Sequence, residues 1–277
     1  MYTYKNLIDD IEILHSCGAK TGSIGTSLLG NEIYYVHTGI SEGNQLIITG
    51  GIHARENVTT QLVIKQAYRH LRLPMGIYFV PMLNPDGALL IERGSAVAGE
   101  YAALLLEING SEDFSQWKAN ARAVDLNNNF DARFGTGKSN VTHPASHGYV
   151  GEHPFSEPET AALRDFTLAV KPYYTVSYHA LGREVYWDFG QKSDKDRAMA
   201  QSIANMLGYD CVDGDLGSAG GYKDWCILQG IPGVTIEIGS SWLSHPLSAR
   251  DITDDVCVNI DLPSEIARQY PKIYGVE

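Results

Sequence analysis

Short apolar runs rich in β-branched residues alternate along this chain with segments of helical periodicity. Continuous apolar runs of this length are typical of strands buried on both faces of a sheet, whereas the intervening segments repeat their apolar residues with helical spacing. The runs expected as strands cover residues 32–37, 45–49, 77–82, 173–179 and 233–238. The segments expected as helices cover residues 58–71, 156–170, 193–207, 224–228 and 264–274. This order predicts an α/β fold whose sheet, largely parallel or mixed, is covered by helices on both faces.

The length of 277 residues allows one large domain or two small ones. Because the chain has no internal repeat, no low-complexity tract and no long linker, we expect residues 1–277 to form one domain. Residues 88–155 break the alternation, with many Gly, Asn, Ser and His and little periodicity. Long irregular segments are usually functional loops, so we expect this region to border the active site.

Two local signals predict where elements begin or end. The sequence Asn84-Pro85-Asp86-Gly87 predicts a turn that closes the strand 77–82. Ser156 followed by Glu159 has the spacing of a capping box, which predicts that a helix begins with Ser156 as its N-cap.

The chain carries 21 Lys and Arg against 33 Asp and Glu, a formal net charge of −12. Nucleic acids and anionic membranes are bound through basic patches, so we expect neither as a partner. The N-terminal segment MYTYKNLIDDIEIL carries acids where a secretion signal carries Lys or Arg, and no apolar core follows it. These observations predict a cytoplasmic protein.

Polar side chains follow two of the expected strands, at the place where open α/β sheets bind ligands. His53 and Glu56 come after the run 45–49, and a tight loop entering a helix can aim both at one point. His179 closes the run 173–179. Two histidines and a carboxylate form a ligand set that leaves zinc an open position for water. The alternative is a solvated His53 beside a glutamate at a helix N-terminus, with His179 a core histidine.

Glu237 is a lone carboxylate between Ile236 and Ile238 in an apolar run. Burying an unpaired carboxylate is costly unless a cation, a metal ion or hydrogen bonds meet it. A base beside a metal-activated water, with a pKa raised toward neutrality by burial, would meet that need. The alternative is a structural ion pair with a nearby Lys or Arg.

Ordered segments along most of the chain resemble the motifs of the zinc carboxypeptidase family, the M14 metallopeptidases. The segments are residues 51–56 (first zinc motif), 80–87 (N-P-D-G), 124–130 (D-L-N-R-N) and 235–237 (catalytic glutamate). The resemblance implies that His53, Glu56 and His179 hold one zinc ion, as in the known His₂Glu site of carboxypeptidase A. It further implies that Glu237 is the general base. The fold it implies is a single-domain α/β/α sandwich around a mixed, largely parallel eight-stranded sheet.

Two departures from the family pattern indicate a branch. Asn128 stands where the family's exopeptidases have the arginine that holds the substrate's terminal carboxylate, and an amide cannot make that bidentate charged contact. The arginine that polarises the scissile carbonyl is matched by Lys118, with Arg122 nearby as the alternative. The segment 117–122, together with Asn127 and Asn128 of D-L-N-N-N, resembles the bacterial γ-D-glutamyl-meso-diaminopimelate peptidases, which hydrolyse cell-wall stem peptides.

The resemblance also places Lys223 near the substrate. The family's substrate-capping tyrosine falls near Leu216 and not at Tyr222, which we expect only as a further substrate contact. Lys223 falls at the base of the pocket beyond the scissile bond, where a cation suits the distal carboxylate of diaminopimelate. Alternatively, Lys223 and Asp224 open a short helix with exposed charges. The remaining expected substrate contacts are Arg122, Asn127 and Asn128.

Together these residues predict a zinc metallopeptidase, with one zinc ion per chain, that hydrolyses the γ-D-glutamyl-diaminopimelate amide of small muropeptides. A metallocarboxypeptidase or a small-amide deacylase of other specificity would share the zinc site and differ in the pocket. A non-catalytic muropeptide-binding module is a third possibility. The sequence does not decide the oligomeric state.

Overall fold

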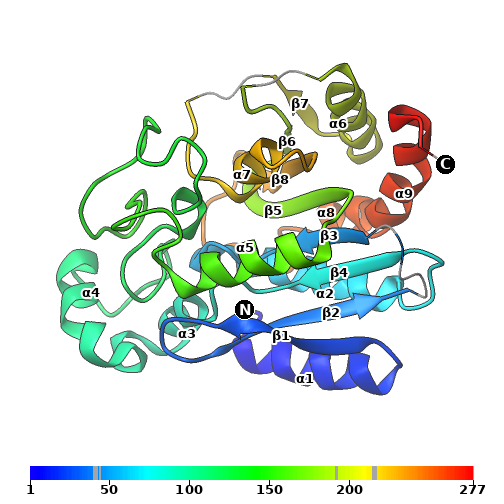
Figure 1. Cartoon of the computed structure of the whole chain (residues 1–277). Helices are drawn as coiled ribbons and strands as arrows, with labels where there is room; N and C mark the ends of the chain where they lie inside the picture. Colours follow the sequence, from blue (N-terminus) through cyan, green and yellow to red (C-terminus); the bar gives the residue numbers. More distant parts are fainter. Residues whose placement is uncertain (40–42, 44, 191–192, 214–216, 277) are drawn as a thin grey trace.

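The computed structural model describes residues 1–39, 43, 45–190, 193–213 and 217–276. These residues build one eight-stranded sheet in the order β1-β2-β4-β3-β5-β8-β6-β7 (Figure 1). The central strands β4, β3, β5 and β8 run parallel to one another. At one side β2 pairs antiparallel with β4, and β1 pairs antiparallel with β2. At the other side β6 pairs antiparallel with β8, and β7 runs parallel to β6. The expected mixed, largely parallel sheet is therefore confirmed. The strands are β1 (Lys20–Thr26), β2 (Glu32–Thr38), β3 (Gln45–Thr49), β4 (Gly76–Val80), β5 (Tyr174–Gly182), β6 (Glu184–Tyr186), β7 (Asp210–Val212) and β8 (Gly233–Ser240).

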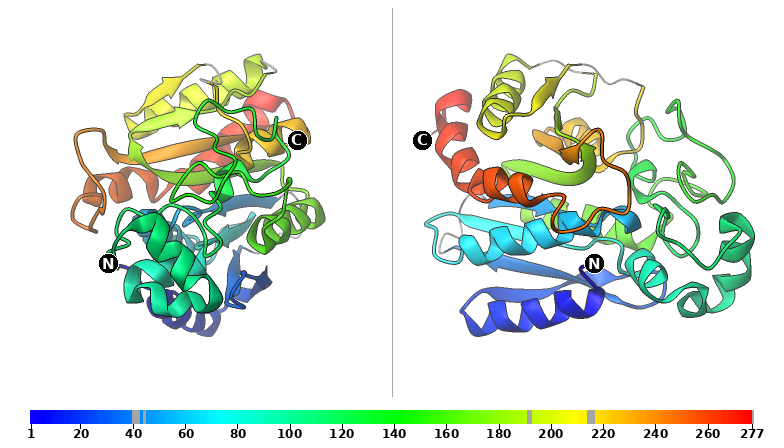
Figure 2. Two further views of the ribbon diagram at one scale, coloured as in Figure 1. Left: turned by 90° about the vertical axis from the view of Figure 1, so that its left-hand side faces the viewer. Right: turned by 180° about the vertical axis from the view of Figure 1, so that it is seen from behind.

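Helices cover both faces of the sheet, so the chain forms three layers (Figure 2). One face packs against α1 (Tyr4–Ser16), α2 (Asn57–Arg69), α6 (Asp194–Leu207) and α9 (Leu262–Tyr274), and the apolar side chains between them form the larger core cluster. The other face packs against α5 (Pro158–Val170) and α7 (Tyr222–Leu228) around a second cluster. The short helix α8 (Thr253–Asn259) precedes α9.

The predicted turn at Asn84 is wrong, because these residues begin a helix. Asn84 is the N-cap of α3 (Pro85–Arg93), its side chain accepts a hydrogen bond from the Gly87 N–H at 2.9 Å, and Pro85 occupies the first helical turn. Proline suits that position because the missing N–H has no partner within a helix. Asn, Pro, Asp and Gly are typical both of turns and of the first residues of helices, so the sequence pattern alone did not separate the two.

The predicted capping box at Ser156 is also wrong. Helix α5 begins at Pro158 with Glu157 as N-cap, and no side chain caps it. Ser156 instead donates a hydrogen bond to Glu157 Oε1 at 2.8 Å. Glu159 is buried and accepts a hydrogen bond from the Leu28 N–H at 3.1 Å, so it connects α5 to the turn between β1 and β2 rather than closing a capping box.

The segment 88–155 is less irregular than its composition indicated. Its first part holds the end of α3, the 3-10 helix η2 (Ser95–Tyr101) and α4 (Ala102–Asn109), which form a third apolar cluster. Beyond α4 the chain is irregular except for the one-turn helix η3 (Leu126–Asn128). Among the described residues, no helix is both long and apolar enough to span a lipid bilayer.

Candidate active site

His53 and Glu56 are carried by the loop that leaves the buried strand β3. The strand ends at Thr49, and Gly51 then turns the chain with a φ of +58°, a conformation that favours glycine. The 3-10 helix η1 (Ala54–Glu56) follows directly, and α2 begins at the next residue. The tight turn thus brings both side chains over the carboxyl ends of the central strands.

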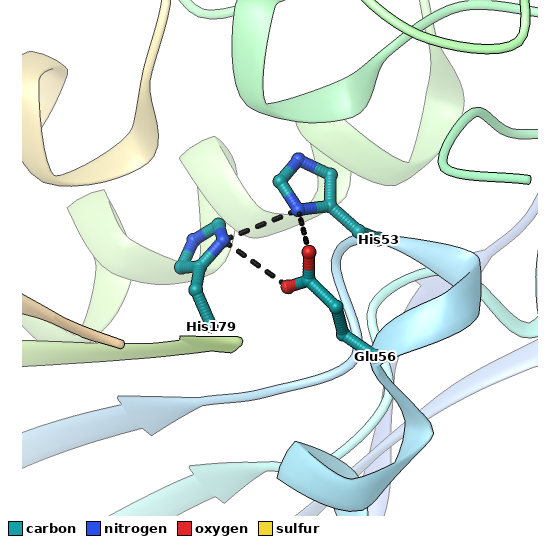
Figure 3. A group of neighbouring side chains, drawn as sticks. All are labelled: His53, Glu56 and His179. Carbon is teal, nitrogen blue, oxygen red and sulfur yellow. Dashed lines mark hydrogen bonds and ion pairs between the residues drawn. The ribbon is translucent and has the colours of Figure 1, made fainter. Parts of the chain in front are cut away.

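The side chains of His53, Glu56 and His179 point toward one another (Figure 3). His53 Nδ1 lies 2.9 Å from Glu56 Oε1 and 3.2 Å from His179 Nδ1. His179 Nδ1 lies 3.4 Å from Glu56 Oε2. All three residues are buried, and one potential ligand atom from each lies within 4.8 Å of the other two. The three predicted ligands are therefore brought together.

This arrangement fits a single divalent cation. Ring nitrogens 3.2 Å apart repel one another if both carry lone pairs, and a cation between them converts this repulsion into attraction. Zinc bonds imidazole nitrogen at about 2.0–2.1 Å, which suits such a separation. Within the described parts of the chain, no other cluster of three His, Cys, Asp or Glu side chains has a geometry suited to a metal ion.

At Glu56 and His179 the electrostatics favour the protonation states that metal ligands need. Burial opposes ionisation of Glu56, but His53 and His179 outweigh burial and hold the pKa of Glu56 well below its usual range. Burial lowers the pKa of His179, which keeps its ring neutral near pH 7. An ionised carboxylate and a neutral imidazole are the forms that bind metal.

Asp125 completes the site and was not recognised as functional from the sequence. Its Oδ1 lies 3.1 Å from His53 Nε2, and its Oδ2 accepts a hydrogen bond from the Gly148 N–H at 2.9 Å. Burial opposes ionisation of Asp125, but the neighbouring His53 lowers its pKa. A carboxylate that binds the far nitrogen of a metal-ligating histidine fixes the ring and its tautomer. Asp125 is the aspartate of D-L-N-N-N. A histidine that binds metal through one ring nitrogen usually has a hydrogen-bond partner at the other, and this requirement could have pointed to Asp125 in the sequence.

Glu237 lies beside the three candidate ligands but does not belong to their cluster. It is the register partner of His179 across β5 and β8, so both side chains leave the sheet on the same face. Burial raises the pKa of Glu237 to about 8, and Glu56 adds to this effect while Lys118 opposes it. Glu237 forms no ion pair or hydrogen bond with any described residue, so the structure does not show the structural ion pair considered above.

Lys118 lies close enough to the site for its charge to act there. The pKa values of His53 and Glu237 are both raised overall, and the Lys118 ammonium opposes the rise at each. The Lys118 backbone carbonyl accepts a hydrogen bond from the Ala54 N–H at 3.1 Å, which fixes the Lys118 loop against the ligand loop. The ammonium has no partner among the described residues. It remains available to a substrate oxygen.

Arg122 is engaged elsewhere. Its Nη1 lies 3.7 Å from Oε1 of the buried Glu157. This placement favours Lys118 over Arg122 as the cation beside the scissile carbonyl.

The other expected substrate residues differ in their surroundings. Asn127 Oδ1 accepts a hydrogen bond from the Tyr222 N–H at 3.1 Å, so it holds the start of α7. Asn128 is partly exposed. The Tyr222 side chain is 0% exposed, its hydroxyl lies 2.9 Å from Thr167 Oγ1, and its ring packs in the second core cluster. This burial argues against the expected contact between Tyr222 and substrate.

Lys223 is a buried cation and not an exposed charge at a helix end. Its side chain is 7% exposed, and Nζ donates to the Asp188 carbonyl at 2.8 Å and lies 2.5 Å from Asp224 Oδ1. An ammonium has three N–H donors. Contacts with Asp188 and Asp224 therefore occupy two of these donors.

Comparison with known protein families decides the classification. The model of the zinc carboxypeptidase (M14 peptidase) family matches residues 4–240, which include all four residues discussed as ligands and base. The chain belongs to the zinc carboxypeptidase family. Members of this family are zinc-dependent hydrolases, so the chain is a metallopeptidase by family, as the sequence motifs indicated.

One similar relative is the γ-D-glutamyl-L-diamino acid endopeptidase 1 of Lysinibacillus sphaericus. It is 29% identical over 90% of this chain, and the chain spans 68% of its length. The chain spans between 43% and 64% of the lengths of further relatives.

Solved structures of the family share the fold. Bovine thrombin-activatable fibrinolysis inhibitor superposes with a TM-score of 0.77 at 20% identity, covering 96% of this chain and 97% of that one. The murein-tripeptide amidase MpaA of Escherichia coli O157 superposes with a TM-score of 0.57 at 22% identity, covering 87% and 91%. These likenesses confirm the predicted zinc-carboxypeptidase fold.

Proposed function

We propose that this chain is a zinc-dependent peptidase that hydrolyses the γ-D-glutamyl-meso-diaminopimelate amide of peptidoglycan stem peptides. The observation that carries the proposal is the convergence of His53, Glu56 and His179 with Glu237 facing them from the neighbouring strand. The name of the Lysinibacillus sphaericus relative supports the choice of substrate. On this proposal residues 1–277 are one catalytic domain, and a muropeptide is its small-molecule partner.

His53 Nδ1, His179 Nδ1 and the Glu56 carboxylate would hold one zinc ion, with Asp125 orienting the first ring. Zinc bound there supplies a Lewis acid and water acidified toward neutral pH.

Glu237 acts as the general base and then the general acid. Its carboxylate accepts a proton from the attacking water and returns it to the amine nitrogen that leaves. A pKa raised by burial suits both transfers, because a group that titrates near neutral pH can take a proton and give it back.

Lys118 stabilises the negative charge that develops on the carbonyl oxygen. A preorganised cation in a partly desolvated site contributes more to the transition state than it does in water.

Two residues support this substrate specificity: Asn128, which replaces an arginine, and the cation Lys223. Asn128 cannot form the bidentate contact by which an arginine holds a C-terminal carboxylate, which disfavours ordinary carboxypeptidase action. Lys223 offers its remaining N–H to the distal carboxylate of diaminopimelate. A lysine or arginine side chain in that pocket would meet a like charge.

The test is incubation of the zinc-loaded protein with L-Ala-γ-D-Glu-meso-diaminopimelate, followed by mass spectrometry. Release of free diaminopimelate supports the proposal. Cleavage only of ordinary α-linked peptides at their C-termini would favour a carboxypeptidase, and cleavage only of simple N-acyl amides would favour a deacylase. Binding of the tripeptide without turnover by zinc-loaded protein would favour the non-catalytic module.

A further inference from the structure

Glu184 extends the row of polar side chains that His179 and Glu237 begin. It is the register partner of Glu237 across the antiparallel strands β6 and β8, just as His179 is across the parallel strands β5 and β8. Register partners project on the same face of a sheet, so the three side chains form a row across three neighbouring strands. The strand order places Glu184 on the side of Glu237 that faces away from His179.

The side chains of Glu184 and Glu237 come close to each other beside Gly182. A Cβ atom added to this glycine would lie 2.8 Å from Glu184 Oε2 and 3.5 Å from Glu237 Cβ. Burial is the main cause of the raised pKa of Glu237, and the negative charges of Glu56 and Glu184 add to the rise. Two neighbouring carboxylates repel each other when both are ionised, and a cation beside them removes that repulsion.

No cation of the described residues pairs with Glu184. Its carboxylate forms no ion pair within the described parts of the chain, and its Oε2 accepts a hydrogen bond from the Tyr186 hydroxyl at 2.5 Å. Burial and the charges of Glu184 and Glu237 raise the pKa of Tyr186, so this partner is neutral. Glu184 also lies outside the cluster suited to a metal ion. The carboxylate can therefore take a cation from a bound ligand.

Glu184 is presented by a rigid corner of the chain. The preceding residue, Arg183, donates through Nε and Nη2 to the two carboxylate oxygens of Asp255, at 3.0 and 3.1 Å. Asp255 is buried and also accepts a hydrogen bond from the Tyr209 hydroxyl. A bidentate pair of this kind fixes geometry as well as charge. It engages the guanidinium next to Glu184 in the chain and leaves the Glu184 carboxylate beside Glu237.

On the proposed function, the leaving residue of the substrate lies on the Glu184 side of the base. Glu237 returns its proton to the leaving nitrogen, so that nitrogen lies next to Glu237 while the carbonyl carbon lies toward His179. The row of side chains then continues to Glu184. Lys223 donates to the carbonyl of Asp188, two residues after β6 ends, at 2.8 Å. The segment that begins with Glu184 thus carries a negative charge at one end and contacts a positive charge at the other.

We propose that Glu184 is a specificity-determining residue that binds the side-chain ammonium of a diamino acid in the leaving position. The distal stereocentre of diaminopimelate carries an ammonium and a carboxylate, so Glu184 meets the first as Lys223 meets the second. A leaving residue without that ammonium leaves the Glu184 and Glu237 carboxylates unscreened, which disfavours it. This inference rests on the proposed function and names the residue that would select a diamino acid.

The test measures the binding of two leaving products to the zinc-loaded protein by calorimetry. The ligands are free meso-diaminopimelate and L-2-aminopimelate, in which a hydrogen replaces the distal ammonium. Neither has a bond to hydrolyse, so binding reports on the pocket alone. Glu184→Gln and the charge-keeping Glu184→Asp are compared with wild type, and Glu12→Gln, at an exposed position on α1, is the control. Zinc content and the urea-unfolding midpoint are measured for each protein.

We expect wild type to bind meso-diaminopimelate at least about tenfold more tightly than L-2-aminopimelate, since the second ligand lacks a charge-assisted hydrogen bond. Glu184→Gln should bring this ratio to about one with zinc retained, Glu184→Asp should keep part of it, and Glu12→Gln should leave it unchanged. Equal affinity of wild type for the two ligands would overturn the inference. Equal weakening of both ligands by Glu184→Gln would also overturn it, because that pattern indicates a structural role.

Turnover of the corresponding tripeptides separates the role of Glu184 from the proposed function. Cleavage of both tripeptides without preference, with equal affinity for the two products, would leave the peptidase standing and remove the role of Glu184. A tenfold preference in product binding without cleavage of either tripeptide would support the role of Glu184 and remove the peptidase.

Discussion

His179 and Glu237 are register partners on the neighbouring parallel strands β5 and β8. Paired residues of adjacent strands project on the same face, so the sheet itself sets a proposed metal ligand beside the proposed base. This register, rather than any loop, fixes the position of Glu237 relative to His179.

Glu237→Gln should remove activity and keep the metal. The amide has nearly the same shape but cannot accept the proton from water, so kcat/KM should fall by about 10²–10⁴. Zinc per chain, measured by atomic spectroscopy after dialysis, should equal that of wild type. Loss of zinc from this variant would show that Glu237 is a ligand.

Asp125→Asn should weaken zinc binding without abolishing it. The carboxylate at 3.1 Å from His53 Nε2 orients the ring, and loss of such a partner typically lowers metal affinity about 10–100-fold. Competition against a chelator measures the change, with Asp113→Asn at an exposed loop position as the control. An affinity equal to that of wild type would contradict the role of Asp125.

Lys118→Met should lower kcat by about 10²–10³ with zinc retained, because removing one charge-stabilising group of this kind has an effect of that size. Arg122→Met should instead lower stability, since it leaves the buried Glu157 without its cation. Steady-state kinetics and urea unfolding of both variants distinguish these outcomes. The reverse pattern would make Arg122 the electrophile.

Tyr222→Phe should leave KM unchanged and lower the free energy of unfolding by about 1 kcal/mol, the usual net value of one hydrogen bond. The lost contact is the one to Thr167 Oγ1 at 2.9 Å, so Thr167→Val should have a similar effect and the two should not add. A rise in KM at unchanged stability would restore the substrate role expected from the sequence.

Glu159→Gln should change how stability depends on pH. Burial raises the pKa of Glu159 from 4.5 to about 8, with the neighbouring Asp86 and Glu157 adding to this effect. Since the folded pKa lies above the unfolded one, the folded state binds the extra proton, and wild type loses stability as pH rises from about 4.5 to about 8. Relative to Glu159→Gln, the loss should be on the order of 3 kcal/mol by urea unfolding at pH 5.5 and 8.5. A constant difference between the two proteins would contradict the raised pKa.

The strands that position the site could be predicted from sequence because each is buried and apolar throughout. The run 45–49 coincides with β3, and the run 233–238 lies within β8. The candidate ligands could be predicted because open α/β sheets bind ligands beyond the carboxyl ends of their strands. Asp125 could not, because nothing local shows that an irregular loop folds back to within 3.1 Å of His53.

Roles that depend on packing could not be predicted from the sequence. Tyr222 reads equally well as a substrate contact or a core residue, and only the positions of Phe130 and Trp225 around it decide for the core. Glu159 has the sequence signature of a cap, but its partner Leu28 lies far away in the chain. The expected cytoplasmic location and the oligomeric state stay open to experiment.

X-ray absorption at the zinc edge of the loaded protein tests the central claim most directly. The account predicts one zinc ion per chain with two imidazole nitrogens and carboxylate oxygen at about 2.0–2.2 Å. The two imidazoles should disappear from the spectrum of a His53→Ala, His179→Ala double variant. A shell of thiolate sulfur near 2.3 Å, or an unchanged spectrum in that variant, would contradict it.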